Sequence, residues 1–501
     1  MFTFTLDILL FFIVITPLTG LLGHKIGFRR LSTISATVGF IISLASLPSL
    51  YNQVLDSGGI ITTTFESLVM RPIAVCLEID MLSIFMTAIF LFIGLMTCVY
   101  SIRFMEHDTG LVEYYTLLLI TVAGMVGVSF AGDFFTLFIF WEIMCISSYA
   151  LVAFRKGKWE PVEAGFKYLI MGSAGSITVL YAMSLLYGMA GTLNFAYLST
   201  RLSSMPNDIW LYLALTLIIV GFGVVASIAP FHTWLPDAHA AAPSPISALL
   251  SGIVIKTGAY ALIRCLLLLF IPEQFAWQSV LAIFAIFTMF VGNFMALIQK
   301  DIKRLLAFSS VVNMGYIIFA LSIRTEQGLT GGLFHIMNHA VIKALLFLCV
   351  GSFIYRTETR NLEKLTGIGR KMPVTTALFA IGALAAAGFP GLNGFMSEIM
   401  IVIAGIDVGW YIPTALMLLN ILFSIAYYLL LIHTFIIKKP TTNFEGVKES
   451  PKSMLAIMVI LATLCVVIGI YPAPFINFAN VAAKAALNIQ AYIEAVIGAS
   501  M

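Results

Sequence analysis

The sequence predicts an all-α polytopic membrane protein with about fourteen transmembrane helices. Of its 501 residues, 60% are hydrophobic and only 10% are charged, whereas soluble domains carry about 25% charged residues. Apolar runs of roughly 20 residues recur from end to end, and each is long enough to cross the ~30 Å hydrocarbon core of a bilayer. Lysine and arginine concentrate in alternate loops between these runs. A large soluble core is therefore excluded.

The apolar runs define the expected spans in order. The first run has no basic segment before it and no small-residue cleavage site after it, so we expect a retained span rather than a signal peptide. A last hydrophobic stretch, 475–497, follows a proline-rich break and carries Lys484 and Glu494, which favour a terminal helix lying along the membrane surface or a partner. The fourteen spans are 6–23, 31–50, 79–101, 112–130, 133–153, 163–188, 209–230, 243–271, 275–298, 302–323, 329–355, 373–406, 410–437 and 453–471.

The basic residues orient these spans. One set of alternate loops holds only Arg71, Arg201 and Arg324. Because loops rich in lysine and arginine stay in the cytoplasm, the basic set is predicted to be cytoplasmic and both termini to lie on the outer side. The basic set is Lys25, Arg29, Arg30, Arg103, Arg155, Lys156, Lys158, Lys300, Lys303, Arg304, Arg356, Arg360, Lys364, Arg370, Lys371, Lys438, Lys439, Lys448 and Lys452.

Two spans are interrupted by proline and glycine, at 229–237 in span seven and at 387–394 in span twelve. Broken backbone at membrane depth must be buried in protein or line a wet cavity, and matching breaks in two halves indicate a transport site. The breaks are five spans apart, and an odd shift reverses orientation, so spans 4–8 and 9–13 are expected to be inverted repeats. The predicted units are residues 1–111, 112–271, 275–437 and 438–501.

No resident cofactor is expected. The six cysteines are scattered singly, whereas iron–sulfur, haem c and zinc-ribbon sites need clustered ligands. No phosphate-cradling glycine motif follows a strand pattern. The net charge of +3 and the lack of a basic run argue against a nucleic-acid partner.

Ionisable residues inside the spans are the candidate functional residues. Each costs about 2.5–3.5 kcal/mol at bilayer depth, so each is by default a functional hypothesis. Glu142 lies in the middle of span five and Lys256 midway through span eight. Glu142 could instead be a neutral, hydrogen-bonded acid. Lys256 is too central to reach the membrane surface by snorkelling, and a buried lysine readily gains and loses a proton.

His335, His339 and Lys343 are spaced four residues apart, so they share one face of the helix expected at 329–355. A line of titratable groups is typical of a proton relay. Metal binding by the histidine pair and simple hydrogen bonding between helices are the alternatives. No metal site is favoured, because no acidic or thiol ligand accompanies the pair in this motif.

Other polar residues lie at or near the breaks. Glu398 follows the second break directly, where it can meet water and freed carbonyls. Asp237 and His239 lie near the first break and are either ligands of a loop or solvated residues. Asp133 begins span five and is best explained as a helix cap. His232, within the first break, and Lys167 are secondary candidates.

These residues, in this order, resemble the antiporter-like membrane subunits of respiratory complex I, of Mrp cation/proton antiporters and of membrane-bound hydrogenases. The resemblance rests on Phe140-Trp141-Glu142, on 230–239 followed by Pro243-Ser244-Pro245, on 301–310 and on 343–347, and it covers essentially the whole chain. It implies a proton- or sodium-translocating subunit that works beside homologous subunits in a multisubunit complex of a prokaryotic cytoplasmic membrane. It also places Glu142, Lys256, His335, His339 and Glu398 on a central hydrophilic axis, where glutamate at Glu398 is similar to the M-type subunits.

One position departs from this pattern. The family pairs its span-five glutamate with a lysine shortly before the first break, and Val225 takes that lysine's place here. Asn313 likewise stands where some members have histidine. Lys256, Lys167 or a neighbouring subunit would then have to balance Glu142. The alternatives are therefore a structural subunit that does not pump, a stand-alone solute carrier or, least favoured, a quinone-reducing enzyme.

Overall fold

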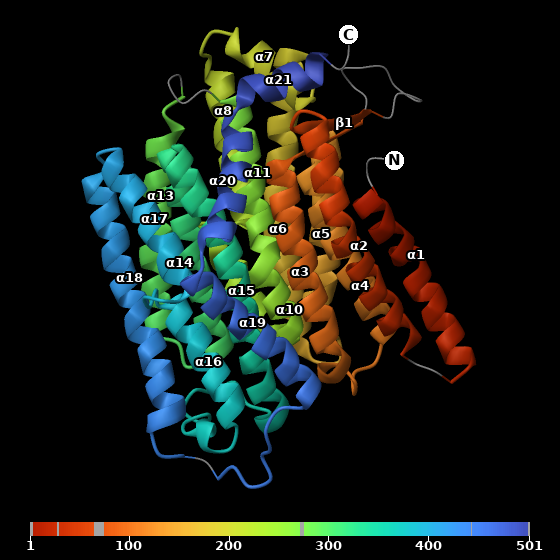
Figure 1. Ribbon diagram of the computed structural model, residues 1–501, viewed down its shortest axis with the longest axis vertical. Coiled ribbons are helices and arrows are strands. Elements are labelled where there is room, and N and C mark those ends of the chain that lie inside the picture. Colours follow the sequence, from red (N-terminus) through yellow and green to blue (C-terminus); the bar gives the residue numbers. More distant parts are fainter. Residues whose placement is uncertain (1–3, 28–29, 65–74, 271–274, 442, 499–501) are drawn as a thin grey trace.

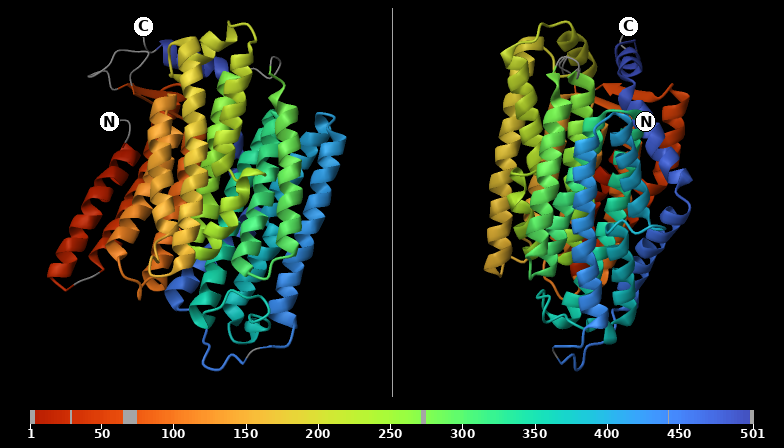
Figure 2. Two further views of the ribbon diagram at one scale, coloured as in Figure 1. Left: turned by 180° about the vertical axis from the view of Figure 1, so that it is seen from behind. Right: turned by 90° about the vertical axis from the view of Figure 1, so that its left-hand side faces the viewer.

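The computed structural model describes all residues except 1–3, 28–29, 65–74, 271–274, 442 and 499–501. Arg29 and Arg71, which entered the orientation prediction, and the end of the span expected at 243–271 lie outside the described residues. Helices dominate, as the composition predicts, and they stand side by side in one bundle (Figure 1). The bundle is broader in this view than after a quarter turn (Figure 2).

The chain begins with three long helices, α1 (Phe4–Lys25), α2 (Leu31–Asp56) and α3 (Met81–Phe104). An antiparallel hairpin of β1 (Ile60–Thr64) and β2 (Cys76–Asp80) joins α2 to α3. The sequence analysis did not predict this hairpin. It lies at the end of the bundle where α1 begins (Figure 1).

The next helices correspond to spans four to eight. Span seven is divided: α8 stops at Val225, and the chain then makes a short 3-10 turn and a two-turn helix before it re-enters the bundle. Span eight contains a π-helical turn immediately before Lys256. A short helix that was not predicted, α7, lies between spans six and seven. The elements are α4 (Leu111–Phe130), α5 (Phe134–Val152), α6 (Trp159–Ala190), α7 (Phe195–Ser203), α8 (Ile209–Val225), η1 (Phe231–Thr233), α9 (Trp234–Ala241), α10 (Ser244–Leu249), η2 (Leu250–Val254) and α11 (Ile255–Leu269).

The following helices correspond to spans nine to thirteen. Span twelve is divided where Gly388 and Gly391 take positive φ angles of 68° and 88°, which L-residues with a side chain rarely adopt. The elements are α13 (Trp277–Leu297), α14 (Ile302–Ile323), α15 (Glu326–Thr357), η3 (Ile368–Arg370), α16 (Pro373–Ala386), α17 (Asn393–Asp407), α18 (Tyr411–Ile432) and η4 (His433–Ile437).

The C-terminal segment forms α19 (Lys452–Ile470), α20 (Ala473–Leu487) and α21 (Ile489–Gly498). Helix α20 packs along α15 and α3, and it buries a stripe of alanines, Ala479, Ala482, Ala483 and Ala486. The expected helix on the membrane surface is therefore wrong: this stretch lies against the body of its own chain. Small side chains allow such close helix packing.

Many helices begin at a polar cap whose side chain accepts a backbone N–H bond, which satisfies the free donors of the first turn. Asp80, Asp133, Asn194, Asp208, Asp301 and Thr325 play this part for α3, α5, α7, α8, α14 and α15. Asp133 is thus a cap, as predicted. Because these caps are set by local sequence, they fix the helix ends that position the interior residues.

Among the described residues, twelve helices are long and apolar enough to cross a membrane. The two expected spans outside that set are the divided ones, represented by α8 and by α16 with α17. Helices α14 and α15 are buried along their most apolar stretches, whereas α1 is mostly exposed at one edge of the bundle (Figure 1). The core of the molecule therefore lies around α11, α14 and α15.

Candidate functional site

A buried polar axis runs through the core of the bundle. We use this name for Lys256, His335, His339, Lys343 and Glu398 together with the uncharged residues that connect them. All five are at most 5% exposed. They lie on α11, α15 and α17, so the structure brings together residues that the sequence predicted separately.

Lys256 takes its position from the π-helical turn η2. Its Nζ atom donates a hydrogen bond to the carbonyl oxygen of Ser251, within that turn. The wider ring of a π turn loosens the usual backbone pairing, and such turns are frequent at functional sites. The Ser251 hydroxyl in turn hydrogen-bonds to the Ser310 hydroxyl of α14 at 2.7 Å. Lys256 is therefore linked to α14 through a single serine.

Lys343 contacts the next residue of α14. Its Nζ atom donates to the Ser309 hydroxyl, to the Tyr428 hydroxyl at 3.0 Å and to the Leu306 carbonyl at 3.3 Å. Three donors of an ammonium group are thus satisfied by three neutral oxygens. No carboxylate pairs with Lys343 within the part of the chain that the structure describes.

His335 continues the connection towards the second break. Its Nε2 atom lies 3.0 Å from the side-chain oxygen of Asn313, whose amide donates to the Ser309 carbonyl at 2.8 Å. Its Nδ1 atom lies 2.9 Å from the Ser397 hydroxyl, next to Glu398 in sequence. Hydrogen-bonding groups therefore follow one another from Lys343 to the residue beside Glu398.

His339 lies between the two lysines. Its ring stacks on that of His335 with 6.0 Å between the centroids, and it lies within the electrostatic influence of both Lys256 and Lys343. Neither ring nitrogen has a hydrogen-bond partner among the described residues. The structure also places no group of three or more His, Cys, Asp or Glu in its described part where they could hold a metal ion.

Glu398 lies against the second break. The carboxyl group touches the backbone of Gly388, where a Cβ atom would overlap with its Oε2 atom. Gly388 therefore serves two needs, a positive φ angle and room for the carboxyl group. Asn393 and Asn338 hydrogen-bond to each other across α17 and α15 and hold the break in place.

Glu142 is not joined to this axis by a hydrogen bond. It is partly buried on α5, and its Oε1 atom has no partner among the described residues. Lys167, one expected partner, instead pairs with Asp237 at 3.1 Å and with Glu163 at 2.8 Å. Val225 is buried at the end of α8. The described part of the chain thus supplies no ion-pair partner for Glu142.

The residues at the first break divide into two groups. Asp237 is half-buried and forms ion pairs with Lys167 and Arg304. His239 is fully buried and stacks on Phe347, with 4.8 Å between the centroids. His232 is buried edge-on against Phe308. Asp237 is therefore a surface ion-pair residue, while the two histidines line the interior.

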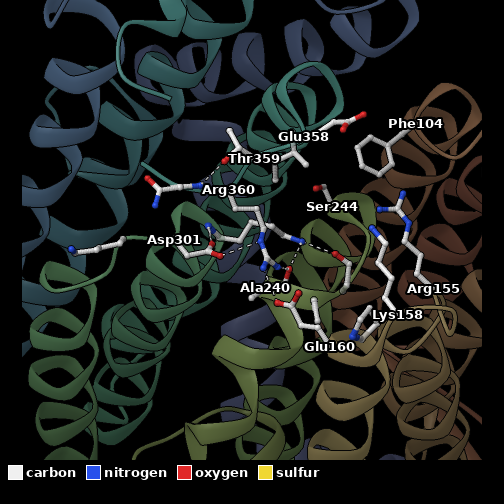
Figure 3. A pocket seen from close by; sticks show the side chains of 17 residues that line it. Phe104, Arg155, Lys158, Glu160, Ala240, Ser244, Asp301, Glu358, Thr359 and Arg360 are labelled. Carbon is white, nitrogen blue, oxygen red and sulfur yellow. Dashed lines mark hydrogen bonds and ion pairs between the residues drawn. The ribbon is translucent and has the colours of Figure 1, made fainter. Parts of the chain in front are cut away.

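A cavity of about 520 Å³ opens beside the first break, at the end of the bundle that carries the basic loops (Figure 3). Buried Lys303 donates to the carbonyl of Ala242 at 2.6 Å in its wall. Arg360 joins Asp301, Glu160 and the Ala240 carbonyl across the cavity. His239 lies next to Ala240 in sequence, so the cavity approaches the interior histidine from outside.

The sequence analysis missed the residues that connect the charged groups. Ser251, Ser309, Ser397 and Tyr428 carry no charge, and such hydroxyls are common in transmembrane helices. The motif at 301–310 contains Ser309 and Ser310 and was the only signal that could have found them. Asn313 was noticed only as a departure from the family pattern, yet it joins His335 to α14.

Comparisons with known proteins agree with this arrangement. Residues 131–424 match the family described as NADH:quinone oxidoreductase/Mrp antiporter, TM, and residues 71–115 match the N-terminus of complex I chain 5. NADH-quinone oxidoreductase subunit N of Desulforudis audaxviator is 32% identical over 80% of this chain and 83% of its own length. The putative antiporter subunit mnhD2 of Staphylococcus epidermidis is 30% identical over 86% of both.

A solved structure extends the likeness to the whole fold. A chain of the membrane-bound sulfane sulfur reductase, an archaeal respiratory membrane complex, is 30% identical and superposes with a TM-score of 0.89. The match covers 98% of this chain and 99% of that one. With its polar axis, its two broken helices and these matches along most of its length, the chain belongs to the NADH:quinone oxidoreductase/Mrp antiporter family of membrane subunits.

Proposed function

We propose that this chain moves protons, or sodium ions, across a membrane along the buried polar axis, as one subunit of a larger complex. The observation that carries the proposal is the unbroken series of polar contacts from Lys256 through α14 to Lys343 and His335. Four groups that can titrate lie in a core that is otherwise apolar. Burying them is costly, and a relay accounts for their order.

The partners follow from the relatives. These are subunits of NADH-quinone oxidoreductase, of an antiporter and of a respiratory membrane complex. We therefore expect this chain to assemble with other membrane subunits, including homologous antiporter-like ones. Its described residues then supply the ion path, and the driving reaction comes from the partners.

The orientation rests on charge. Basic residues 155–158, 300–304 and 356–371 gather at one end of the bundle, and α1 begins and α21 lies at the other (Figure 1). By the positive-inside rule, the basic end faces the cytoplasm and both termini lie outside, in a prokaryotic cytoplasmic membrane. The cavity at the first break is then the cytoplasmic entry to His239 and Lys256.

Two inverted units, residues 112–271 and 275–437, account for the two breaks. In support, α4 packs on α5 as α13 packs on α14, and each unit contains one divided span. Residues 1–111 and 438–501 flank these units. Ion handover near the breaks at His239 and Glu398 would then use equivalent places in the two halves.

Replacing Glu142 by glutamine tests the proposal in the assembled complex. We expect ion-coupled activity to fall at least tenfold while assembly is retained, because the isosteric amide cannot exchange a proton in the same way. Glu113→Gln, in the first turn of the neighbouring helix α4, is a matched control that should transport normally. Wild-type transport by the Glu142 variant would contradict the role of Glu142.

A second candidate is a structural subunit that does not pump, and it is favoured by Val225 and the unpartnered Glu142 carboxyl oxygen. Lys256→Ala separates the two functions: transport is lost if the axis conducts and is retained if the subunit is structural. Val225→Lys should raise transport only if the missing lysine had weakened it.

A further inference from the structure

A second buried polar cluster lies outside the axis, at the end of the bundle where α21 packs. We call it the outer cluster and define it as Glu78, Asp80, Asn194, Arg264 and Tyr492. Each is at most 6% exposed. They come from β2, from the cap of α7, from α11 and from α21, so distant segments of the chain meet to enclose them.

One acid of the outer cluster is neutralised. Arg264 donates to both carboxylate oxygens of Asp80, at 2.6 and 2.9 Å. The rings of Tyr260 and Tyr492 flank the guanidinium, with centroids 5.6 and 5.7 Å away. Although burial disfavours its charge, Asp80 keeps a pKa below the usual range because Arg264 is adjacent. This pair accounts for the only cation of the cluster.

Glu78 is left without an ion pair of its own in the described part of the chain. Its Oε1 atom accepts from the Asn194 amide at 3.1 Å and from the Cys76 thiol at 3.3 Å, and Tyr492 hydrogen-bonds to Oε2. Burial raises the pKa of Glu78 to about 7, against the opposing effects of these hydrogen bonds and of Arg264. The carboxyl group can therefore gain or lose a proton near neutrality.

The remaining ionisable group nearby does not change this balance. Asp133 is engaged as the cap of α5 and accepts the backbone N–H of Cys76 at 2.9 Å. Gly132 packs directly on the Glu78 carboxyl, where a Cβ atom would overlap. The Glu78 site is thus enclosed by hydrogen-bonding groups and by a glycine that makes room for it.

One face of α11 connects the outer cluster to the polar axis. Lys256, Tyr260 and Arg264 are four residues apart and therefore share a face over a rise of about 12 Å. The Tyr260 hydroxyl accepts from Arg264 Nε at 3.2 Å and donates to the Ser129 carbonyl at 2.8 Å. Every residue of α11 is buried, so this polar face lies entirely within the protein.

We propose that Glu78 is the outer proton-binding site of this chain, reached from Lys256 along the face of α11 and covered by Tyr492. The step is a proton transfer: the Lys256 ammonium loses a proton, the Tyr260 hydroxyl accepts one and gives one up, and the Glu78 carboxylate becomes a carboxylic acid. The proton then leaves to the outer side past α21. This proposal rests on the proposed function, since it supplies an exit for the same axis.

Infrared difference spectroscopy of the purified complex tests the binding step without transport. On raising the pH from 5.5 to 8.5, wild type should lose a carboxylic-acid stretching band with a midpoint near pH 7, whereas Glu78→Gln should lack that band. Tyr492→Phe removes a donor to the carboxylate and should move the midpoint to higher pH. A spectrum of Glu78→Gln identical to that of wild type would overturn the proposal.

Proton movement in proteoliposomes under an imposed pH gradient tests the exit. Glu78→Gln should slow it at least tenfold, and Glu494→Gln, on the exposed side of α21, should leave it within twofold. If Glu142→Gln stops transport but Glu78→Gln does not, the exit is overturned while the proposed function stands. If Glu142→Gln transports normally, the proposed function fails, and the infrared band still decides whether Glu78 binds a proton.

Discussion

At the scale of single residues, the polar axis depends on side chains without charge. The charged members could be predicted from the sequence, because an ionisable residue in an apolar run is conspicuous. Ser309 and Asn313 could not, since their importance comes from which helix faces them. Asn313 has Ser309 on one side and His335 on the other, and no pattern within α14 reveals this.

Asn313→Leu should therefore disconnect the two halves of the axis. The leucine fills a similar volume but cannot accept from His335 or donate to the Ser309 carbonyl, so we expect transport to fall at least tenfold in an assembled complex. Asn313→His keeps a hydrogen-bonding group and should retain most of the activity. Proton uptake by proteoliposomes measures both, and equal rates for the leucine variant and wild type would count against the connection.

At the scale of elements, the spans were predictable because each is a local apolar run, and both breaks were predictable from proline and glycine. The hairpin of β1 and β2 and the short helix α7 were not predicted. They are brief, and their position depends on contacts with distant segments, such as those of Asn194 with Glu78 and Gly132. The packing of α20 against α15 and α3 was also missed, because a hydrophobic face does not identify what covers it.

The second break gives a prediction with a close control. Gly388 and Gly391 both have positive φ, so an alanine at either position costs roughly 1–2 kcal/mol in backbone strain. Only at Gly388 would the new methyl group meet the Glu398 carboxyl group; at Gly391 no atom lies within 4 Å. We expect Gly388→Ala to impair transport more than Gly391→Ala at similar thermal stability. Equal transport by the two variants would show that the contact with Glu398 is unimportant.

At the scale of the whole molecule, long-range pairs hold the outer end together. Glu78 and Tyr492 are 414 residues apart, and Asp80 and Arg264 are 184 apart. Reasoning from local pattern left Arg264 without a role, because only the folded chain brings α11 beside the start of α3. The fold class was thus predictable, whereas the outer cluster was accessible only from tertiary structure.

Arg264→Met should destabilise this assembly. Removing one partner of a buried ion pair leaves an uncompensated charge and costs about 3–5 kcal/mol, so we expect a clear fall in the thermal unfolding temperature of the purified protein. Adding Asp80→Asn should restore part of the loss because the stranded charge disappears. A double variant less stable than Arg264→Met alone would refute this explanation.

The adjacent serines of α14 have a mechanical consequence. Ser310 reaches the Lys256 side through Ser251, while Ser309 reaches Lys343. Consecutive residues of a helix point about 100° apart, so α14 cannot turn to strengthen one contact without disturbing the other. Helix α14 therefore works like a two-pole switch: a single small rotation would open or close both halves of the circuit together.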